Sequence, residues 1–248
     1  MSILGIIPAR HASTRFPAKP LVALDGKSMI RRVYEQAKKS TSLSKVVVAT
    51  DHEEIFNHVI AFGGEACMTS ADHASGTDRC FEVLMKETVP FDYVINVQGD
   101  EPFIAPQQID LLASLLDGKT ELATLIKKID SVEQLFNPNL VKAVINKNSE
   151  ALYFSRAPIP WFRNMEQVEW VTHHTYYKHI GMYAYRKDVL EKITQLGISA
   201  LEKTESLEQL RWLENGYKIK VKETQIETIG IDTPEDLEKA LRLLKDNA

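Results

Sequence analysis

The chain has 248 residues, of which 44% are hydrophobic and 26% are charged, as in ordinary soluble globular proteins. Its net charge of −4 gives no general attraction to nucleic acid or anionic lipid, so neither is an expected partner and any anion site must be local. The two cysteines, Cys67 and Cys80, form no C-x-x-C motif, and no apolar run approaches the ~20 residues that cross a bilayer. We therefore expect a cytoplasmic enzyme or binding protein with reduced cysteines.

The first 120 residues alternate between short apolar runs and helical patterns. Continuous apolar strands separated by helices of about 10–15 residues are typical of βαβ units with a parallel sheet. Strands are predicted at 3–7, 46–49, 66–68 and 93–97, and helices at 28–39, 53–61, 77–86 and 106–116. The predicted fold class is therefore α/β, with a Rossmann-like, doubly wound and mostly parallel sheet.

After residue 120 the alternation is less regular. Strands are predicted at 122–126, 141–145, 180–185 and 219–221, and helices at 202–214 and 234–245. The last helix has a clear start, because Thr233 can cap it, Pro234 suits its first position and Asp236 follows three residues after the cap. Between these elements, YFSRAPIPWFRNMEQVEWVTHH is aromatic and interrupted by prolines, which indicates a smaller inserted lid or subdomain.

Three cations follow the first predicted strand, in the segment PARHASTRFPAKP. They are Arg10, Arg15 and Lys19, and no glycine stands among them. A Gly-rich phosphate cradle is therefore absent here. The segment GKS at 26–28 does not supply one either, since the P-loop needs a glycine where Leu21 stands. Side-chain charges, rather than backbone amides, are the phosphate-binding groups that this loop offers.

Other familiar catalytic motifs are missing. HEEIFNH places its histidines six residues apart, so they do not share a helix face as the two zinc ligands of H-E-x-x-H do. The adjacent pair His173 and His174 has no third ligand nearby in the sequence, and no G-x-S-x-G nucleophile motif is present. These absences disfavour zinc hydrolysis on such a helix and acyl-enzyme chemistry.

Two carboxylates stand at turns of the chain. Asp100 directly follows the predicted strand at 93–97, where Gly99 lets the backbone turn, and Asp232 precedes the Thr233 cap. Ligands of open parallel sheets bind beyond the carboxyl ends of the strands, so Asp100 is expected at the same edge as the cationic loop. Asp232 alone suits a helix-start role. With the cations, the two carboxylates suit Mg²⁺ bound against a polyphosphate.

Nine motifs in order resemble one enzyme family. The chain is similar, from residue 3 to about 240, to the 3-deoxy-manno-octulosonate cytidylyltransferases through IIPARHASTRFPAKPL, ATDHEE, SADHASGTDR, INVQGDEP, FNPNLVKAV, ALYFSRAPIPW, HIGMYAYR, LEKTESLEQLRWLENG and GIDTPEDLEKA. The resemblance implies transfer of CMP from CTP to the anomeric hydroxyl of 3-deoxy-D-manno-octulosonate (Kdo), with release of pyrophosphate. That reaction activates Kdo for lipopolysaccharide synthesis.

The resemblance also implies a fold, a cofactor and an assembly. The fold is that of the nucleotide-diphospho-sugar transferases, as one domain over residues 1–248, with a homodimer and Mg²⁺ as cofactor. Residues 1–120 would mainly bind CTP, and residues 121–248 would mainly bind the sugar acid and form the dimer. His11, Phe16 and Ala18 stand where many relatives have Tyr, Leu and Gly, and Ala18 limits access of the loop to positive φ.

The family's functional positions map onto this chain residue by residue. The catalytic positions implied are Arg10, Lys19, Asp100 and Asp232, and the last two are the metal ligands. The nucleotide-binding positions implied are Ala9, Arg10, Arg15, Lys19, Ser75, Gly76 and Asp100. The substrate-binding positions implied are Arg79, Gln98, Arg156, His179, Tyr183, Glu208 and Gln209.

Several of these residues also have simpler interpretations. Arg79 lies early in a helix, where its charge opposes the helix dipole, so either a ligand or an acidic partner is expected. Arg156 could be a surface arginine, and the remaining pocket residues could be solvated or satisfied within the core. The tryptophans are expected in packing or dimer contacts; they are Trp161, Trp170 and Trp212.

Three alternative functions remain open at this point. The sugar acid could be a sialic acid or an amino analogue of Kdo. Glycosyl transfer on the same fold is disfavoured, because Q-G-D-E stands where that chemistry uses D-x-D. The third alternative is an inactive nucleotide-binding regulator, and release of pyrophosphate would distinguish it from an enzyme.

Overall fold

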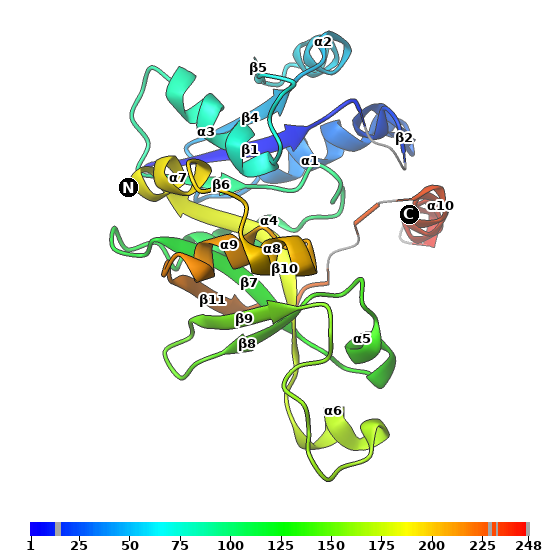
Figure 1. Ribbon diagram of the computed structural model, residues 1–248. Helices are drawn as coiled ribbons and strands as arrows, with labels where there is room; N and C mark the ends of the chain where they lie inside the picture. The colour runs from blue at the N-terminus through cyan, green and yellow to red at the C-terminus, as the bar shows by residue number, and fades with distance from the viewer. Residues whose placement is uncertain (13–15, 228–229, 232, 247–248) are drawn as a thin grey trace. The chain divides into compact units, whose positions relative to one another are not determined.

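The computed structural model describes residues 1–12, 16–227, 230–231 and 233–246. Its contacts divide the chain into two compact units (Figure 1). Unit 1 is formed by residues 1–113 together with 228–248, and unit 2 by residues 114–227. The end of the chain therefore returns to the first unit. The predicted division of nucleotide and sugar-acid binding at residue 120 stays a prediction.

Unit 1 contains the elements that the periodicity of the first half predicts. Its main strands are β1 (Ile3–Ala9), β4 (Lys45–Thr50), β5 (Ala66–Met68) and β6 (Tyr93–Asn96), and a small hairpin adds β2 (Ala23–Leu24) and β3 (Lys27–Ser28). Its helices are η1 (Lys19–Leu21), α1 (Met29–Ala37), α2 (Glu53–Ala61), α3 (Gly76–Lys86), α4 (Pro106–Ala113) and α10 (Pro234–Asp246). The predicted strands and helices of this part are confirmed.

The strands of unit 1 form a parallel sheet in the order β6-β1-β4-β5 (Figure 1). The strand order reverses at β1, because β4 pairs on one side of it and β6 on the other. Ala9 at the end of β1 is in register with Thr50 at the end of β4. The carboxyl ends of β1 and β6 flank the reversal point, which is where open α/β sheets bind ligands.

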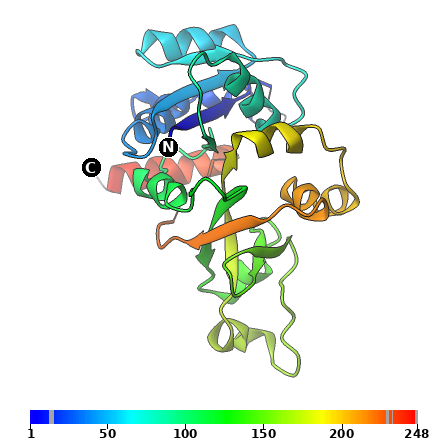
Figure 2. The ribbon, with the colours of Figure 1, turned by 90° about the vertical axis from the view of Figure 1, so that its left-hand side faces the viewer.

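Helices cover both sides of this sheet. Figure 2 shows α1 and α4 on one side and α3 on the other. Met29, Ile30 and Val33 of α1 are fully buried, and Cys80 and Val83 of α3 are buried at helical spacing. These apolar stripes account for the doubly wound arrangement predicted from the sequence.

Helix α10 begins as its sequence predicts. The Thr233 hydroxyl accepts a hydrogen bond from the backbone N–H of Asp236 at 3.3 Å, and the Asp236 carboxylate accepts from the backbone N–H of Thr233 at 3.1 Å. Ala240 then packs in a cluster with Leu24 and Met29. The helix is thereby fixed against the β2–β3 hairpin and α1 of the same unit.

Unit 2 combines short helices with strands that pair both in parallel and antiparallel. Its strands are β7 (Leu122–Lys128), β8 (Lys142–Ile145), β9 (Ala151–Ser155), β10 (Tyr177–Arg186) and β11 (Ile219–Glu223). Its helices are α5 (Val132–Phe136), η2 (Gln167–Glu169), α6 (Trp170–His173), α7 (Lys187–Thr194), α8 (Ala200–Glu205) and α9 (Gln209–Glu214). Strand β7 pairs in parallel with β11 and antiparallel with β10, while β8 pairs antiparallel with both β9 and β10.

The prediction of one continuous helix over 202–214 is wrong. Ser206 has φ 53°, a left-handed conformation that ends α8, and α9 begins after Glu208. Leu207 is buried between the two helices. The break could not be predicted, because apolar residues keep helical spacing across it. Serine, moreover, does not usually adopt a left-handed conformation, so its presence gave no warning.

The aromatic segment that follows β9 forms a small cluster of its own. Trp170 is fully buried with Ile129, Leu135 and Tyr176, whereas Trp161 remains largely exposed. Packing is therefore the role of Trp170, as the sequence predicts. Among the described residues no helix is both long and apolar enough to cross a membrane.

Candidate active site

The carboxyl edge of the unit 1 sheet brings the first loop beside the turn after β6. Ala9 is buried at the end of β1, and Arg10 follows it with an exposed side chain. The turn after β6 is closed by a hydrogen bond from the backbone N–H of Glu101 to the Gln98 carbonyl, 3.3 Å. A Cβ on Gly99 would lie 2.5 Å from the Pro8 carbonyl oxygen, so only glycine permits this approach.

Lys19 and Asp100 form an ion pair at this edge. The Lys19 Nζ atom lies 2.8 Å from Oδ2 of Asp100, and the two side chains are 14% and 33% exposed. Lys19 begins the short helix η1, which follows Ala18 in a left-handed conformation with φ 53°. The backbone N–H of Ala18 donates to the His11 carbonyl at 3.1 Å and closes the loop. The cation and carboxylate predicted to share this edge are thus in contact, whereas Arg15 lies outside the described residues.

Asp232 also lies outside the described residues, but its two neighbours are placed. The backbone N–H of Ile231 donates to the Asp100 carbonyl at 2.9 Å, and Thr233 caps α10. The segment that carries Asp232 is therefore bonded to the turn that carries Asp100. The pairing of the two carboxylates around a metal stays a prediction.

The carboxylate of Asp100 fits the requirements of Mg²⁺. It is a partly exposed oxygen donor that directly follows a strand end, and Mg²⁺ binds through one or two carboxylates plus substrate phosphates. Its neighbour Glu101 differs, because burial and then the charge of Asp100 raise the pKa of Glu101 to about 8. One oxygen of Glu101 is buried without a hydrogen-bond partner in the described structure. Glu101 is therefore held uncharged beside a charged Asp100.

The predicted nucleotide-binding residues of α3 lie at the same edge. Ser75 caps the helix, accepting from the backbone N–H of Asp78 while Asp78 accepts from that of Ser75. A Cβ on Gly76 would lie 3.4 Å from Cγ of Pro8, so this helix start is packed against the end of β1. The first turn of α3 is thereby fixed beside the cationic loop.

Arg79 is completely buried. Its guanidinium donates to Asp51 Oδ2 at 2.9 Å and to the Thr69 hydroxyl, while its Nε lacks a partner in the described part of the chain. The acidic partner expected for a cation in the first turn of a helix is therefore Asp51. A direct contact of Arg79 with substrate stays a prediction.

In unit 2, His179 is oriented by a buried threonine. Oγ1 of Thr124 lies 2.8 and 3.1 Å from the carbonyl oxygens of Met182 and Ile180, and 2.9 Å from Nε2 of His179. The hydroxyl proton goes to a carbonyl, since a carbonyl cannot donate, so Nε2 carries the proton of the neutral ring and Nδ1 is left as an acceptor. Burial lowers the pKa of His179 to about 3, which keeps the ring neutral.

Tyr183 follows an irregularity of β10. The β10–β7 register shifts between Ile180 and Tyr183, which re-aims the side chains that follow. The Tyr183 ring lies 5.1 Å from that of His179 and 5.0 Å from that of Trp212. Burial raises the pKa of Tyr183 well above its ordinary value, and the nearby charges of Tyr185 and Glu208 add to the effect.

Two buried donors in this region lack partners. The Tyr183 hydroxyl and the Trp212 indole N–H make no hydrogen bond in the described structure. Buried polar groups are normally paired, so unpaired ones mark a place where a ligand can bind. Glu208 stands at the start of α9 with Gln209 buried next to it, which places both predicted substrate residues on the helix that carries Trp212.

Arg156 is held by neutral oxygens. Its guanidinium donates to the carbonyls of Glu205 at 2.8 Å, Pro138 at 3.2 Å and Ser206 at 3.5 Å. No ion pair of this guanidinium occurs within the described ranges. Nearby Lys142 is buried, and its pKa falls to about 8 because of burial and the charge of Arg156. Lys142 Nζ donates to the carbonyls of Asn137 at 2.9 Å and Leu140 at 2.6 Å, so Arg156 is the cation of this group that suits an anionic group of a substrate.

Thr124, Lys142 and Trp212 were not predicted as functional from the sequence. Thr124 lies in a buried strand, where a threonine is an ordinary residue, and its role depends on the irregularity of β10. The positions of Lys142 and Trp212 within apolar patterns gave only a packing signal. A charged residue inside a predicted apolar strand, as in VKAVI, is the one signal that was available for Lys142.

Comparisons with known proteins identify the family of this chain. A family model described as cytidylyltransferase matches residues 4–223. A 3-deoxy-manno-octulosonate cytidylyltransferase of Cytophaga hutchinsonii is 58% identical over 238 residues, 96% of this chain and 95% of its own. This chain belongs to the 3-deoxy-manno-octulosonate cytidylyltransferase family. It is accordingly a nucleotidyltransferase, as the resemblance implied.

Further relatives extend the match to the whole chain. The 3-deoxy-manno-octulosonate cytidylyltransferase of Parabacteroides distasonis is 58% identical over 249 residues, which cover 98% of each chain. A solved structure of a CMP:2-keto-3-deoxy-manno-octonic acid synthetase complexed with CTP is 43% identical, with a TM-score of 0.93 over 100% of both chains. The predicted fold class is confirmed by this likeness, whereas the inserted lid remains a prediction.

Proposed function

We propose that this protein transfers CMP from CTP to the anomeric hydroxyl of Kdo, giving CMP-Kdo and pyrophosphate. The observation that carries the proposal is the full-length likeness to a synthetase solved with CTP, whose name contains the same sugar acid. The product would be the activated sugar for lipopolysaccharide synthesis. Use of CTP as substrate implies action in the cytoplasm.

In this proposal the edge of the unit 1 sheet binds the triphosphate. Arg10 and Lys19 neutralise phosphate oxygens, and Lys19 is already oriented by Asp100 at 2.8 Å. Asp100 and Asp232 would hold Mg²⁺, which would supply positive charge for the phosphate oxygens and would lower the pKa of the sugar hydroxyl. The hydroxyl oxygen bonds to the α-phosphorus as the bond to the β-phosphate oxygen breaks, and the hydroxyl proton is released. Positioning and electrostatics contribute most of the rate in such transfers.

The sugar acid is bound by residues of unit 2. Arg156, whose guanidinium meets only neutral oxygens in the described structure, pairs with the carboxylate. The Nδ1 atom of neutral His179 accepts a hydrogen bond from a sugar hydroxyl, and the Tyr183 hydroxyl donates one. Glu208 and Gln209 complete the polar set from the start of α9.

The proposal also includes a homodimer. Large apolar side chains of unit 2 stand exposed at Trp161, Val168 and Leu152, and the last lies on β9, which pairs only with β8 among the described strands. Large apolar side chains that stand exposed suit contact with a second copy. Light scattering should give twice the chain mass, and Trp161→Glu should shift it toward the monomer. A chain that stays monomeric at all concentrations would contradict this part.

Pyrophosphate release tests the reaction. The chain is incubated with CTP and Kdo, with and without Mg²⁺, and compared with sialic acid and with the other three nucleoside triphosphates. Release only with CTP, Kdo and Mg²⁺ is the expected result. Release with CTP and a different keto acid would overturn the sugar assignment, and CTP binding without release with any acid would overturn the enzymatic one.

A further inference from the structure

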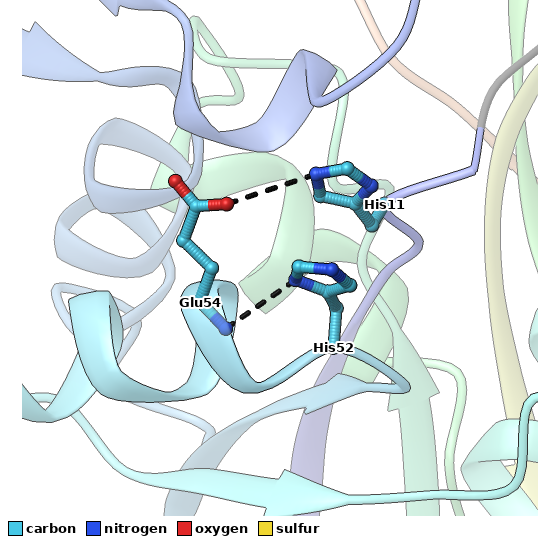
Figure 3. Close-up of side chains that lie close together, drawn as sticks. All are labelled: His11, His52 and Glu54. Carbon is cyan, nitrogen blue, oxygen red and sulfur yellow. Dashed lines mark hydrogen bonds and ion pairs between the residues drawn. The ribbon is translucent and has the colours of Figure 1, made fainter.

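Two histidines from different segments of unit 1 stack on each other. His11 follows the end of β1, and His52 stands between β4 and α2; their rings are 3.8 Å apart with an interplanar angle of 14° (Figure 3). The strands explain the approach, because β1 and β4 are adjacent and parallel, with Ala9 in register with Thr50. The two residues therefore leave the sheet side by side, although 41 positions separate them in the sequence.

A carboxylate completes this group. Oε2 of Glu54, in the first turn of α2, lies 3.8 Å from Nε2 of His11 (Figure 3). Each of His11, His52 and Glu54 has a ligand atom within 4.8 Å of the ligand atoms of the other two. The His11 and Glu54 side chains are 33% and 65% exposed, so an ion can reach the group from solvent.

Two imidazoles and one carboxylate form a donor set for a first-row transition metal. Zn²⁺ takes four ligands from nitrogen, sulfur and oxygen, and three protein ligands leave one position for water. Mg²⁺ prefers oxygen donors and retains its waters, so this group is chemically distinct from the Asp100 edge. We propose that His11, His52 and Glu54 bind one divalent transition-metal ion, with Zn²⁺ as the representative case.

Binding requires a limited rearrangement. The lone pairs of the stacked rings lie in two nearly parallel planes, so at least one ring must turn for both nitrogens to reach a common ion at about 2.0–2.1 Å. His52 also caps α2, since its Nδ1 accepts from the backbone N–H of Glu54 at 3.3 Å. Coordination through Nε2 moves the ring proton to Nδ1 and breaks this cap. The site is therefore expected to bind in the micromolar range rather than as tightly as a structural zinc site.

The ligand variants can be chosen to preserve the local structure. His11→Phe keeps a ring that can stack on His52 but has no nitrogen ligand. His52→Asn removes the imidazole while keeping a side chain that is among the best helix caps. Glu54→Gln keeps the size of the third ligand and removes its charge. As a matched control, the double variant His173→Gln/His174→Gln removes two exposed histidines from unit 2.

Titration calorimetry of the full chain with ZnCl₂, in buffer free of Mg²⁺, tests the proposal. One Zn²⁺ per chain is expected for the wild type and the control. Each histidine variant should weaken binding by more than the about 10- to 100-fold that loss of a second-shell partner costs. Absorption of bound Co²⁺ should show a four- or five-coordinate site that both variants lose. Circular dichroism verifies that each variant is folded.

Three results would each overturn the proposal. One is the absence of saturable binding by the wild type below millimolar Zn²⁺. The second is binding that survives unchanged in folded His11→Phe and His52→Asn, and the third is binding that disappears in the His173→Gln/His174→Gln control. None of these readouts depends on transfer of CMP, so failure of the metal site and failure of the proposed reaction are separately detectable.

Discussion

In unit 1 the ion pair of Lys19 and Asp100 carries charge and meets water, whereas in unit 2 the side chains of Tyr183 and Thr124 are buried and uncharged. The Lys19–Asp100 pair is partly exposed, but Tyr183 is only 7% exposed and Thr124 is fully buried. An ion without a partner in the interior costs several kcal/mol, whereas an unpaired neutral hydroxyl costs about 1–3 kcal/mol. A neutral buried donor that lacks a partner therefore costs the fold less than a buried ion that lacks one.

This difference indicates how the two regions contribute to a reaction. Charges at a wet edge attract a polyphosphate strongly but distinguish poorly between similar anions. Buried neutral donors discriminate, because an analogue that lacks the matching group leaves them unpaired. We therefore expect phosphate binding and rate to depend on unit 1, and the choice of sugar acid to depend on unit 2.

Asp100→Asn tests the charged region most severely. Loss of the carboxylate charge removes the proposed metal ligand and an ion-pair partner of Lys19, so kcat should fall by about 100- to 1000-fold. Pyrophosphate release measures the rate, and the melting temperature verifies folding. Asp25→Asn, which changes an exposed acid of the same unit, should leave the rate unchanged. A near wild-type rate in Asp100→Asn would remove the basis of the metal assignment.

Tyr183→Phe tests the buried region. The missing hydroxyl should raise KM for Kdo by about 10-fold or more, while stability stays equal or increases, because the hydroxyl is unpaired in the described structure.

Tyr176→Phe is the matched control, since its hydroxyl donates to the Pro160 carbonyl at 3.0 Å. It should lose about 1 kcal/mol of stability and keep its KM. Urea unfolding and steady-state kinetics measure both quantities. A stability loss in Tyr183→Phe equal to that of the control would show that Tyr183 is an ordinary core residue.

The pH dependence of stability tests whether His179 is neutral. Burial lowers its pKa from 6.5 to about 3 in the folded protein, so below pH 6.5 the unfolded chain binds a proton that the folded chain does not. The free energy of unfolding should therefore fall as pH decreases from 6.5 toward 3, with a contribution of about 1 kcal/mol per pH unit. Urea unfolding at pH 7, 6 and 5 should give a smaller decrease for His179→Gln. Equal slopes in both proteins would disprove the assignment.

Ala18→Gly should have the smallest effect. Ala18 is left-handed at φ 53°, a conformation that costs about 1 kcal/mol for a residue with a Cβ. Glycine relieves this cost but gains freedom in the unfolded chain, so the net stabilisation should be about 0.5 kcal/mol. Urea unfolding measures it, and Ala18→Val should destabilise. If glycine destabilises instead, the loop before Lys19 is not strained.

Local patterns were sufficient to predict the four strands of the parallel sheet in unit 1 and the helices between them, but not the β2–β3 hairpin or η1. The strands of this parallel sheet are mostly apolar runs, and helices such as α1 and α3 have an apolar stripe that packs on the sheet. In unit 2 the same rules failed at β9, where exposed Leu152 interrupts the apolar pattern, and at Ser206, whose left-handed backbone has no sequence signal. Both features depend on tertiary contacts.

The candidate site shows the same contrast, since its unit 1 part was predictable from the sequence and its unit 2 contacts were not. The proximity of Lys19 and Asp100 follows from the general rule that ligand-binding residues stand at the carboxyl ends of parallel strands. No such rule links Thr124 to His179, because their contact depends on a register shift between β7 and β10. The partner of Arg79 was predictable in type, as an acid, but not as Asp51, which lies 28 positions away.

The contact between the turn after β6 and the end of β1 limits which residues can replace Gly99 during evolution. With 2.5 Å between a Cβ at position 99 and the Pro8 carbonyl oxygen, every side chain larger than hydrogen pushes two backbones apart. Gly197 has open space instead. A selection for active variants from a randomised library should thus accept many residues at 197 and return only glycine at 99. In distant homologues whose loops have changed length, a glycine at the position of Gly99 would still mark where the turn after β6 meets the end of β1.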